Sequence, residues 1–145
     1  MNSNDKILIL DFGSQYTQLI ARRVREIGVF SEVKPSSIST EEIIKMNPSG
    51  IILSGGPETV TISSSQKVHK SLLEAKIPIL GICYGMQTIA KELGGSVVNS
   101  DVREFGHAEI SHVNQSILFD NVSFDLDRLD AVSYTHLTLP TTNRV

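Results

Sequence analysis

The sequence has little cysteine and no long apolar run. Cys83 is the one cysteine among 145 residues, so no disulfide can form within the chain, which excludes a secreted scaffold held together by disulfides. No apolar run approaches the roughly 18 residues of a membrane-spanning helix. Residues 1–6 contain no basic region that leads into a cleavable apolar stretch. We therefore expect a soluble, cytoplasmic protein.

Charge of either sign is not in large excess. The chain has 13 Lys and Arg against 16 Asp and Glu, a formal net charge of −3, and no block of like charges. Such a chain has no general attraction for nucleic-acid phosphates or anionic lipid, so neither is expected as a partner. With 40% hydrophobic and 20% charged residues, the composition is that of a globular protein, and the length suits one domain with one core.

Short apolar runs alternate with amphipathic stretches along the first two thirds of the chain. Buried strands are predicted at 7–10, 29–33, 50–53, 78–82 and 96–98. Helices are predicted between them, at 19–27, after 39, at 66–76 and through 88–93. This alternation is typical of a flavodoxin-like α/β fold, an open and mostly parallel sheet with helices on both faces.

Local signals mark the ends of these helices. In the first, apolar residues that include Leu19 and Ile27 recur at helical spacing, which predicts a buried face, and Gly28 stands where the helix would end. Residues 39–42, Ser-Thr-Glu-Glu, have the spacing of a capping box, and Pro48 would stop the short helix that follows.

Two glycine-containing segments are candidates for a functional site. Residues 54–59, Ser-Gly-Gly-Pro-Glu-Thr, follow a predicted strand, and open α/β sheets place their ligands at the carboxyl ends of strands. Residues 81–85 read Gly-Ile-Cys-Tyr-Gly at a strand-to-helix junction. This is the G-x-C-x-G form of a nucleophile elbow, in which small flanking residues permit a sharp turn.

The elbow would give Cys83 the surroundings of a nucleophile. At a helix N-terminus, backbone N–H groups and the helix dipole favour the thiolate. The N–H of Tyr84 would donate to an oxyanion, and the N–H of Gly56 could supply a second donor. The alternative is that Cys83 is a small buried apolar residue, as lone cysteines often are.

Four blocks of sequence resemble the class I, or triad-type, glutamine amidotransferases. They are 7–18, 47–58, 81–87 and 103–106. The middle two blocks are shared in looser form across the class, whereas the opening block and the Arg-Glu-Phe-Gly at 103–106 resemble the branch that serves GMP synthesis. Because these blocks run through most of the chain, it is identified as a member of this family.

The resemblance implies a glutamine-hydrolysing site. Cys83 would attack the side-chain amide of glutamine to give a glutamyl thioester and ammonia, while the backbone amides of Gly56 and Tyr84 hold the oxyanion. Gly55, Gly56 and Gln87 would bind the substrate, although Gln87, one turn into the helix, could also be an ordinary solvated position. No metal and no cofactor is implied for this half of the reaction.

The resemblance also implies a partner that receives the ammonia. In the family, the ammonia passes to a synthetase (ATP pyrophosphatase) module, which uses ATP and magnesium to aminate xanthosine monophosphate to GMP. These 145 residues contain no such module. The sequence leaves open whether the module belongs to the same chain or is a separate protein.

The family takes its histidine base and an orienting glutamate from a downstream His-Pro-Glu motif, which this sequence lacks. His107 and Glu109 have His-x-Glu spacing within a segment expected to be extended, 107–113, and would share one face of a strand. They directly follow the 103–106 block, which precedes the true motif in the family, so we do not expect them to be catalytic. With base and glutamate absent from the chain, its own glutaminase activity is expected to be low.

The resemblance stops after Asp130. Residues 131–145 look like read-through of vector or adapter sequence rather than a continuation of the family. The expected organisation is therefore a partial amidotransferase domain at 1–130, followed by a non-native tail at 131–145. Because a domain that lacks its last strands exposes a sheet edge, poor solubility is expected.

Two other functions are compatible with the sequence. A flavodoxin-like module could bind a small ligand at its strand ends without catalysis, with Cys83 structural or redox-sensing. An amidotransferase could also serve another synthetase, such as that for anthranilate or carbamoyl phosphate, although residues 12–16 and 84–86 speak against this. Dependence on glutamine separates the first alternative from an enzyme.

Overall fold

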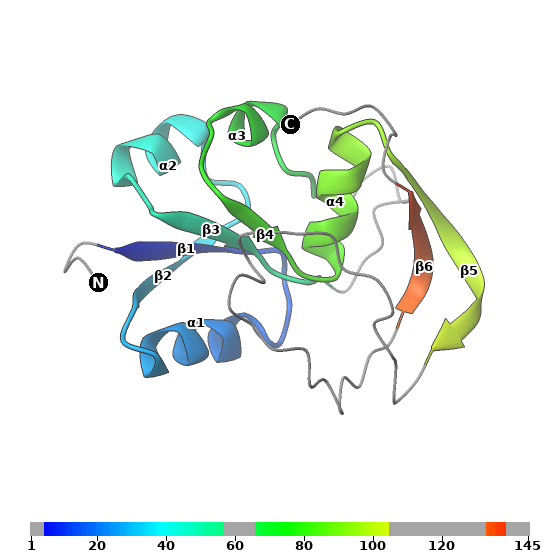
Figure 1. The fold of residues 1–145 in the computed structure, drawn as a ribbon, viewed down its shortest axis with the longest axis horizontal. Helices are drawn as coiled ribbons and strands as arrows, with labels where there is room; N and C mark the ends of the chain where they lie inside the picture. The colour runs from blue at the N-terminus through cyan, green and yellow to red at the C-terminus, as the bar shows by residue number, and fades with distance from the viewer. Residues whose placement is uncertain (1–4, 57–65, 105–132, 139–145) are drawn as a thin grey trace, which may run out of the picture. The chain divides into compact units, whose positions relative to one another are not determined.

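The computed structural model describes residues 5–56, 66–104 and 133–138 (Figure 1). The described residues fall into two compact units, one that includes 5–56 and 66–97 and another that includes 98–104 and 133–136. His107, Glu109 and the expected boundary at Asp130 lie outside the described residues. What the sequence predicts for them stays a prediction.

A four-stranded parallel sheet forms the centre of the first unit. Its strands are β1 (Lys6–Asp11), β2 (Phe30–Pro35), β3 (Gly50–Leu53) and β4 (Ile79–Gly81), in the order β2-β1-β3-β4. All three pairings are parallel, and Ile9 in β1 lies opposite Val33 of β2 and Ile52 of β3. The predicted α/β fold with a parallel sheet is confirmed.

Helices cover both faces of this sheet. In the described chain they are α1 (Thr17–Glu26), α2 (Thr40–Met46), α3 (Lys70–Glu74) and α4 (Tyr84–Glu92). α1 lies on one face, and α2 and α3 lie on the other (Figure 1). Right-handed crossovers produce this division, because the chain moves from β1 to the edge strand β2 in one direction and returns past β1 to β3 and β4 in the other. The strand order therefore reverses between β1 and β3.

The core consists of strand side chains and the helix faces that pack on them. The buried apolar cluster comprises Leu8, Leu10, Phe12, Ile43, Ile51, Leu53, Val68, Leu72 and Tyr84. Ile9 is also fully buried but is not part of this cluster. Because successive side chains of a strand point to opposite faces, Leu8 and Leu10 share one face of the sheet and Ile9 lies on the other. A strand buried on both faces is typical of a parallel sheet covered by helices.

The predicted ends of the first two helices are confirmed. Gly28, with a φ of 84°, follows the end of α1. The Ser39 hydroxyl accepts the N–H of Glu42 at 3.2 Å, and the Glu42 carboxylate accepts the N–H of Ser39 at 3.3 Å. This is a complete capping box at the start of α2. Asn47, in the left-handed region at φ 48°, ends the helix before Pro48.

The helix predicted at 66–76 is shorter than expected, because only Lys70–Glu74 is helical. The residues before it bond to α4 instead. The backbone N–H of Val68 donates to the Thr88 hydroxyl at 3.1 Å, and the backbone oxygen of Gln66 accepts a hydrogen bond from the Tyr84 hydroxyl. These tertiary hydrogen bonds take the place of a first helical turn.

The predicted buried face of α1 is also wrong in part. Leu19 and Ile27 are 44% and 70% exposed, whereas the buried residues of the helix are Thr17 and Ala21. The Ser31 hydroxyl of β2 donates to the backbone oxygen of Ala21 at 2.9 Å. Because that side chain reaches the helix backbone, small residues rather than large apolar ones form the contact between α1 and the sheet.

A second sheet has two strands, β5 (Ser96–Glu104) and β6 (Ser133–Thr138). The strand predicted at 96–98 is therefore confirmed as the beginning of a longer one.

None of the helices in the described ranges has the length and apolar character that a membrane span requires.

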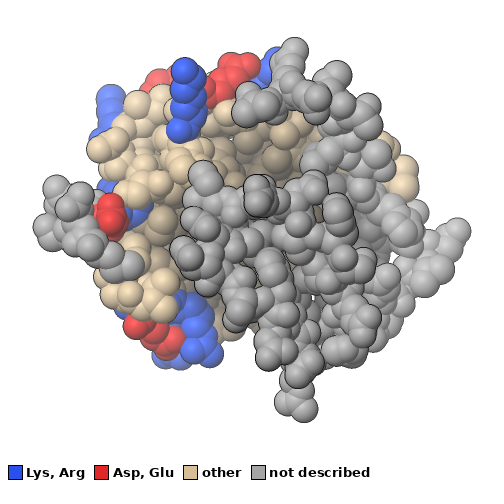
Figure 2. All heavy atoms as spheres, viewed as in Figure 1, with Lys and Arg blue, Asp and Glu red and all other residues tan. Residues whose placement is uncertain are grey.

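Surface charges on the described residues are mixed. On the face shown in Figure 2, basic and acidic side chains lie near one another at the margins, with uncharged surface between them. Glu32 contacts Lys34 at 2.8 Å and Lys6 at 3.8 Å, and Arg23 contacts Glu26 at 2.8 Å. This mixture agrees with the small net charge of the chain.

The capping box predicts the effect of one substitution. Ser39→Ala removes the side-chain acceptor for the Glu42 N–H, so the free energy of unfolding should fall by about 1 kcal/mol. Urea denaturation followed by circular dichroism measures this change. Ser37→Ala, at an exposed loop serine nearby, is the control, and an equal loss in both variants would contradict the assignment of the cap.

Candidate active site

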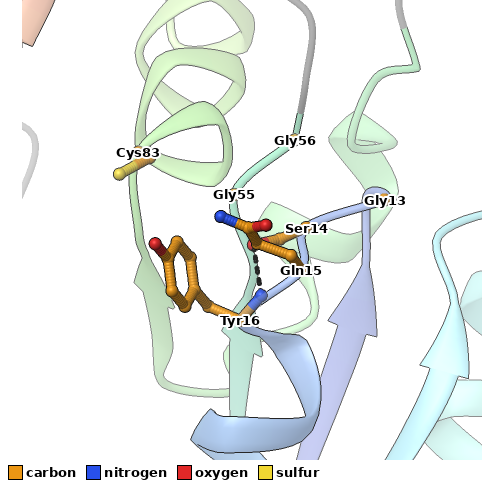
Figure 3. Close-up of a pocket in the computed structure, with 7 residues that line it drawn as sticks. All are labelled: Gly13, Ser14, Gln15, Tyr16, Gly55, Gly56 and Cys83. Atoms are coloured by element: carbon orange, nitrogen blue, oxygen red, sulfur yellow. Dashed lines mark hydrogen bonds between the residues drawn. The ribbon is translucent and has the colours of Figure 1, made fainter.

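A cleft opens at the carboxyl ends of the strands, where the strand order reverses. It has a volume of about 380 Å³ and is lined by Gly13, Ser14, Gln15, Tyr16, Gly55, Gly56 and Cys83 (Figure 3). These residues come from the segments that follow β1, β3 and β4. Ligands of open α/β sheets bind at such a reversal, and the volume suits a small molecule.

Cys83 occupies a sharp turn directly before α4. Its backbone has a φ of 50° and a ψ of −111°, a left-handed conformation that is uncommon for residues other than glycine. The thiol is free and exposed. The predicted elbow is therefore present, and the alternative of a buried apolar cysteine is wrong.

The two glycines of the elbow permit close packing of backbone on backbone. A Cβ on Gly81 would lie 2.6 Å from the backbone nitrogen of Met86, and a Cβ on Gly85 would lie 2.6 Å from the Cβ of Leu53 in β3. The N–H of Gly85 also donates to the backbone oxygen of Ser54 at 3.1 Å. No larger residue fits at either position without displacing backbone.

The segment Ser54–Gly55–Gly56 forms the opposite wall of the cleft. Ser54 is fully buried, its N–H donates to the backbone oxygen of Leu10, and its hydroxyl accepts the N–H of Phe12, both at 3.0 Å. A Cβ on Gly55 would lie 3.4 Å from the Cβ of Cys83, and a Cβ on Gly56 would lie 2.8 Å from the Phe12 carbonyl oxygen. Residues 54–56 of the predicted loop thus lie beside the thiol, and their glycines leave the space open, whereas 57–59 lie outside the described residues.

The loop after β1 forms the third wall, which the sequence did not predict as part of the site. The Asp11 carboxylate accepts hydrogen bonds from the Gly13 N–H and from the Thr17 hydroxyl, both at 2.8 Å. The Ser14 hydroxyl accepts the N–H of Tyr16 at 3.0 Å (Figure 3). The signal that could have found this loop is its place after a central strand, at the same edge as the glycine segment.

Tyr84 begins α4, and its side chain belongs to the core. The side chain is 3% exposed, and its ring packs on Phe12 with the ring centroids 5.4 Å apart. The N–H groups of a helix's first turn point out of its N-terminal end, which here is the end that carries Cys83. Gln87 is half-buried on the same helix and is not among the residues that line the cleft.

The described residues of the cleft walls carry no formal charge. None of the seven lining residues is Asp, Glu, Lys, Arg or His, so a charged ligand would meet hydroxyl, amide and backbone groups there. Over the part of the chain that the structure describes, no group of three His, Cys, Asp or Glu side chains could hold a metal ion. The described lining of the cleft thus presents one thiol, hydroxyl and amide side chains, and glycine backbone.

Comparison with protein families and curated proteins shows the family to which the chain belongs. The family described as "Glutamine amidotransferase class-I" matches residues 8–137. The chain is 53% identical over 124 residues to "GMP synthase [glutamine-hydrolyzing]" of Teredinibacter turnerae, covering 86% of the chain and 24% of that protein. It is 58% identical over 117 residues to the protein of the same name from Tolumonas auensis, covering 81% and 22%. The chain spans about a quarter of the length of these relatives.

Two solved structures are similar in fold. A protein from Thermoplasma acidophilum, described as a putative subunit of GMP synthase, has a TM-score of 0.57 and 33% identity, covering 70% of this chain and 51% of that chain. A glutamine amidotransferase from Thermotoga maritima has a TM-score of 0.58 and 20% identity, covering 97% and 65%. The second likeness shows the fold alone.

The close packing at the elbow predicts the effect of a glycine substitution. Gly85→Ala places a Cβ against the backbone of Leu53, so the free energy of unfolding should fall by about 1–3 kcal/mol. Met86→Ala, at the neighbouring exposed residue, should change it by less than about 0.5 kcal/mol. Urea denaturation of both variants measures the difference, and equal stability would show that the elbow can relax away from β3.

Proposed function

Because the chain belongs to the glutamine amidotransferase class-I family, we propose that it binds glutamine in the cleft and hydrolyses the side-chain amide with Cys83 as nucleophile. The observation that carries this proposal is the exposed Cys83 thiol in a left-handed elbow at the cleft. A thiol that only filled the core would be buried, and strained backbone at an exposed residue is typical of functional sites.

The reaction begins when the Cys83 thiolate attacks the amide carbon of glutamine. A C–S bond forms, and the carbonyl π electrons move to the oxygen, which the backbone N–H groups of Gly56 and Tyr84 stabilise as an oxyanion. The tetrahedral intermediate expels ammonia once the leaving nitrogen has gained a proton, and a glutamyl thioester remains. Water then attacks the thioester carbon, releases glutamate and returns the thiol to Cys83.

The proposed roles of the other residues follow from their places around the thiol. Gly55 and Gly56 line the cleft beside Cys83, so they would contact the amide end of the substrate. Tyr84 begins α4, which supports its amide as an oxyanion donor. Gln87 lies one turn further along α4, and we propose that it contacts a substrate that extends along this helix.

Proton transfer is the step for which the family's usual groups are missing from the sequence. The His-Pro-Glu motif on which the triad-type enzymes depend does not occur among the 145 residues. General acid–base catalysis contributes about 10²- to 10⁴-fold to such reactions. We therefore propose that the chain captures glutamine-like electrophiles but turns over slowly.

The relatives named GMP synthase suggest what becomes of the ammonia. We propose that it passes to a synthetase module that uses ATP and magnesium to aminate xanthosine monophosphate to GMP. The GMP synthases are about four times longer than the matched segment, which supports a module in the same chain. The Thermoplasma acidophilum protein is instead named as one subunit of GMP synthase, which supports a separate synthetase protein.

A cytoplasmic location is part of this proposal, because a free thiol suits a reducing compartment.

Covalent labelling tests the nucleophile. The reagent 6-diazo-5-oxo-L-norleucine carries the α-amino and α-carboxylate groups of glutamine and alkylates thiols, so it should form an adduct at Cys83 that free glutamine suppresses. Mass spectrometry locates the adduct, and Cys83→Ser is the negative control. Alkylation of Cys83 by iodoacetamide but not by the glutamine analogue would instead favour a module that does not bind glutamine.

The rate of glutamine hydrolysis tests the proposal that the chain turns over slowly because it lacks the family's base. Release of glutamate from glutamine, measured with a coupled glutamate assay, should be about 10²- to 10⁴-fold slower than for a complete class I amidotransferase domain under the same conditions. A rate equal to that of the complete domain would contradict the proposal, since some residue of this chain would then have to act as the base.

A further inference from the structure

Ser54 is a buried polar residue that directly precedes the two glycines of the cleft wall. It has no exposed surface, and the cleft is lined by Gly55 and Gly56 but not by Ser54. Burying a hydroxyl costs free energy unless the hydroxyl is hydrogen-bonded. The bonds that this hydroxyl makes therefore indicate what it does at the site.

The Ser54 hydroxyl is bonded both as an acceptor and as a donor. Its oxygen accepts the N–H of Phe12, just after β1, at 3.0 Å. Its proton is directed elsewhere and is donated to the backbone oxygen of Gly55, also at 3.0 Å. The bond to Phe12 fixes the place of the hydroxyl, so the bond to Gly55 holds that carbonyl group in one direction, toward the buried Ser54 side chain.

The Gly55 carbonyl belongs to the same peptide group as the Gly56 N–H, which is one of the two proposed oxyanion donors. None of the peptide bonds in the described residues is cis, and in a trans peptide the C=O and N–H groups point in opposite directions. A carbonyl held by the buried Ser54 hydroxyl thus turns the Gly56 N–H away from the buried side. Because Gly55 and Gly56 line the cleft, that direction leads into the cleft.

A peptide group between two glycines needs such a restraint. Glycine permits more backbone conformations than any other residue. Larger residues do not fit here, because a Cβ on Gly55 would lie 3.4 Å from the Cys83 Cβ and a Cβ on Gly56 would lie 2.8 Å from the Phe12 oxygen. Figure 3 shows Gly55 between Cys83 and Ser14. The crowding that requires glycine also removes the stiffness of a side chain, and the Ser54 hydroxyl replaces it.

We propose that Ser54 is a positioning residue whose hydroxyl fixes the Gly55–Gly56 peptide so that the Gly56 N–H faces the developing oxyanion. This inference rests on the proposed function, because it concerns a donor of that reaction. A donor that is aligned in advance needs no reorganisation as charge develops, which is why aligned donors are effective. In this role Ser54 acts through Gly56 and does not bind the substrate.

Two small reagents separate oxyanion stabilisation from the reactivity of the thiol. With para-nitrophenyl acetate, the Cys83 thiolate attacks the carbonyl carbon, a C–S bond forms through an oxyanion, and the ester C–O bond breaks to release para-nitrophenolate. This leaving group needs no proton, so the missing base does not affect the rate. Iodoacetamide alkylates the same thiolate by displacing iodide, without an oxyanion. The ratio of acylation rate to alkylation rate therefore reports on the oxyanion donors.

The test compares this ratio in the wild-type chain and in Ser54→Ala. The ratio should fall by about tenfold or more, up to the roughly 10²- to 10³-fold loss that follows removal of a whole oxyanion donor, while the alkylation rate stays unchanged. Ser31→Ala is the matched control, because Ser31 is 1% exposed and its hydroxyl bonds the Ala21 backbone oxygen in α1. Its ratio should equal that of the wild-type chain. An unchanged ratio in Ser54→Ala would overturn the inference.

A second measurement uses the wild-type chain alone and so does not depend on the folding of a variant. The ratio in the native chain should exceed the ratio in the same chain unfolded in urea by about tenfold or more, because an unfolded chain holds no donor in line with Cys83. Equal ratios would show that no donor is aligned before the reaction, which contradicts the inference.

Neither reagent carries the α-amino and α-carboxylate groups of glutamine, so the inference and the proposed function can fail separately. If glutamine suppresses labelling by 6-diazo-5-oxo-L-norleucine but Ser54→Ala leaves the ratio unchanged, the inference alone is overturned. If the ratio falls in Ser54→Ala but glutamine does not suppress that labelling, the alignment of Gly56 by Ser54 is supported and glutamine as the substrate is overturned.

Discussion

The first turn of α4 lies directly on the end of β3, and the rest of the site depends on this contact. The N–H of Gly85 donates to the Ser54 oxygen at 3.1 Å, and the N–H of Ile82 donates to the Leu53 oxygen at 3.0 Å. Because backbone packs on backbone here, the chain has to turn sharply at Cys83, where φ is 50°. The exposed thiol is thus a consequence of how closely helix and strand approach, more than of the cysteine side chain itself.

Ser54 extends this constraint to the other walls of the cleft. Its carbonyl oxygen accepts from the start of α4, its N–H donates to Leu10 of β1, and its hydroxyl accepts the N–H of Phe12. A fully buried serine with these bonds joins the ends of β1 and β3 to the elbow, and satisfied buried polar groups favour one arrangement over others. The cleft therefore has a defined shape that does not depend on a ligand, with the reactive groups carried by loops on a rigid sheet.

Features with a local cause could be read from the sequence, and features with a tertiary cause could not. Turn and cap residues act within a few positions, so Gly28, the 39–42 capping box and the elbow at Cys83 were predictable. The unwound start of 66–76 and the exposure of Leu19 depend on partners in other elements, α4 and β2. The loop after β1 has local hydrogen bonds to Asp11 and Ser14, but it was missed as a wall of the cleft because that role depends on β3 and β4, whose following segments reach the same edge of the sheet.

The groups required by the proposed reaction also divide into those that the elbow supplies locally and those that a distant segment must supply. The proposed nucleophile and its proposed backbone donors belong to the elbow and the glycine segment, which lie with the sheet that holds them in the first compact unit. None of the described residues that line the cleft is His, Asp or Glu, so the base that the proposed hydrolysis needs would have to come from another segment of polypeptide. If the proposed function holds, covalent capture of a substrate and its turnover are therefore separable properties of this architecture. Capture depends on the backbone packing that exposes the Cys83 thiol. Turnover depends in addition on a base from a further segment of polypeptide.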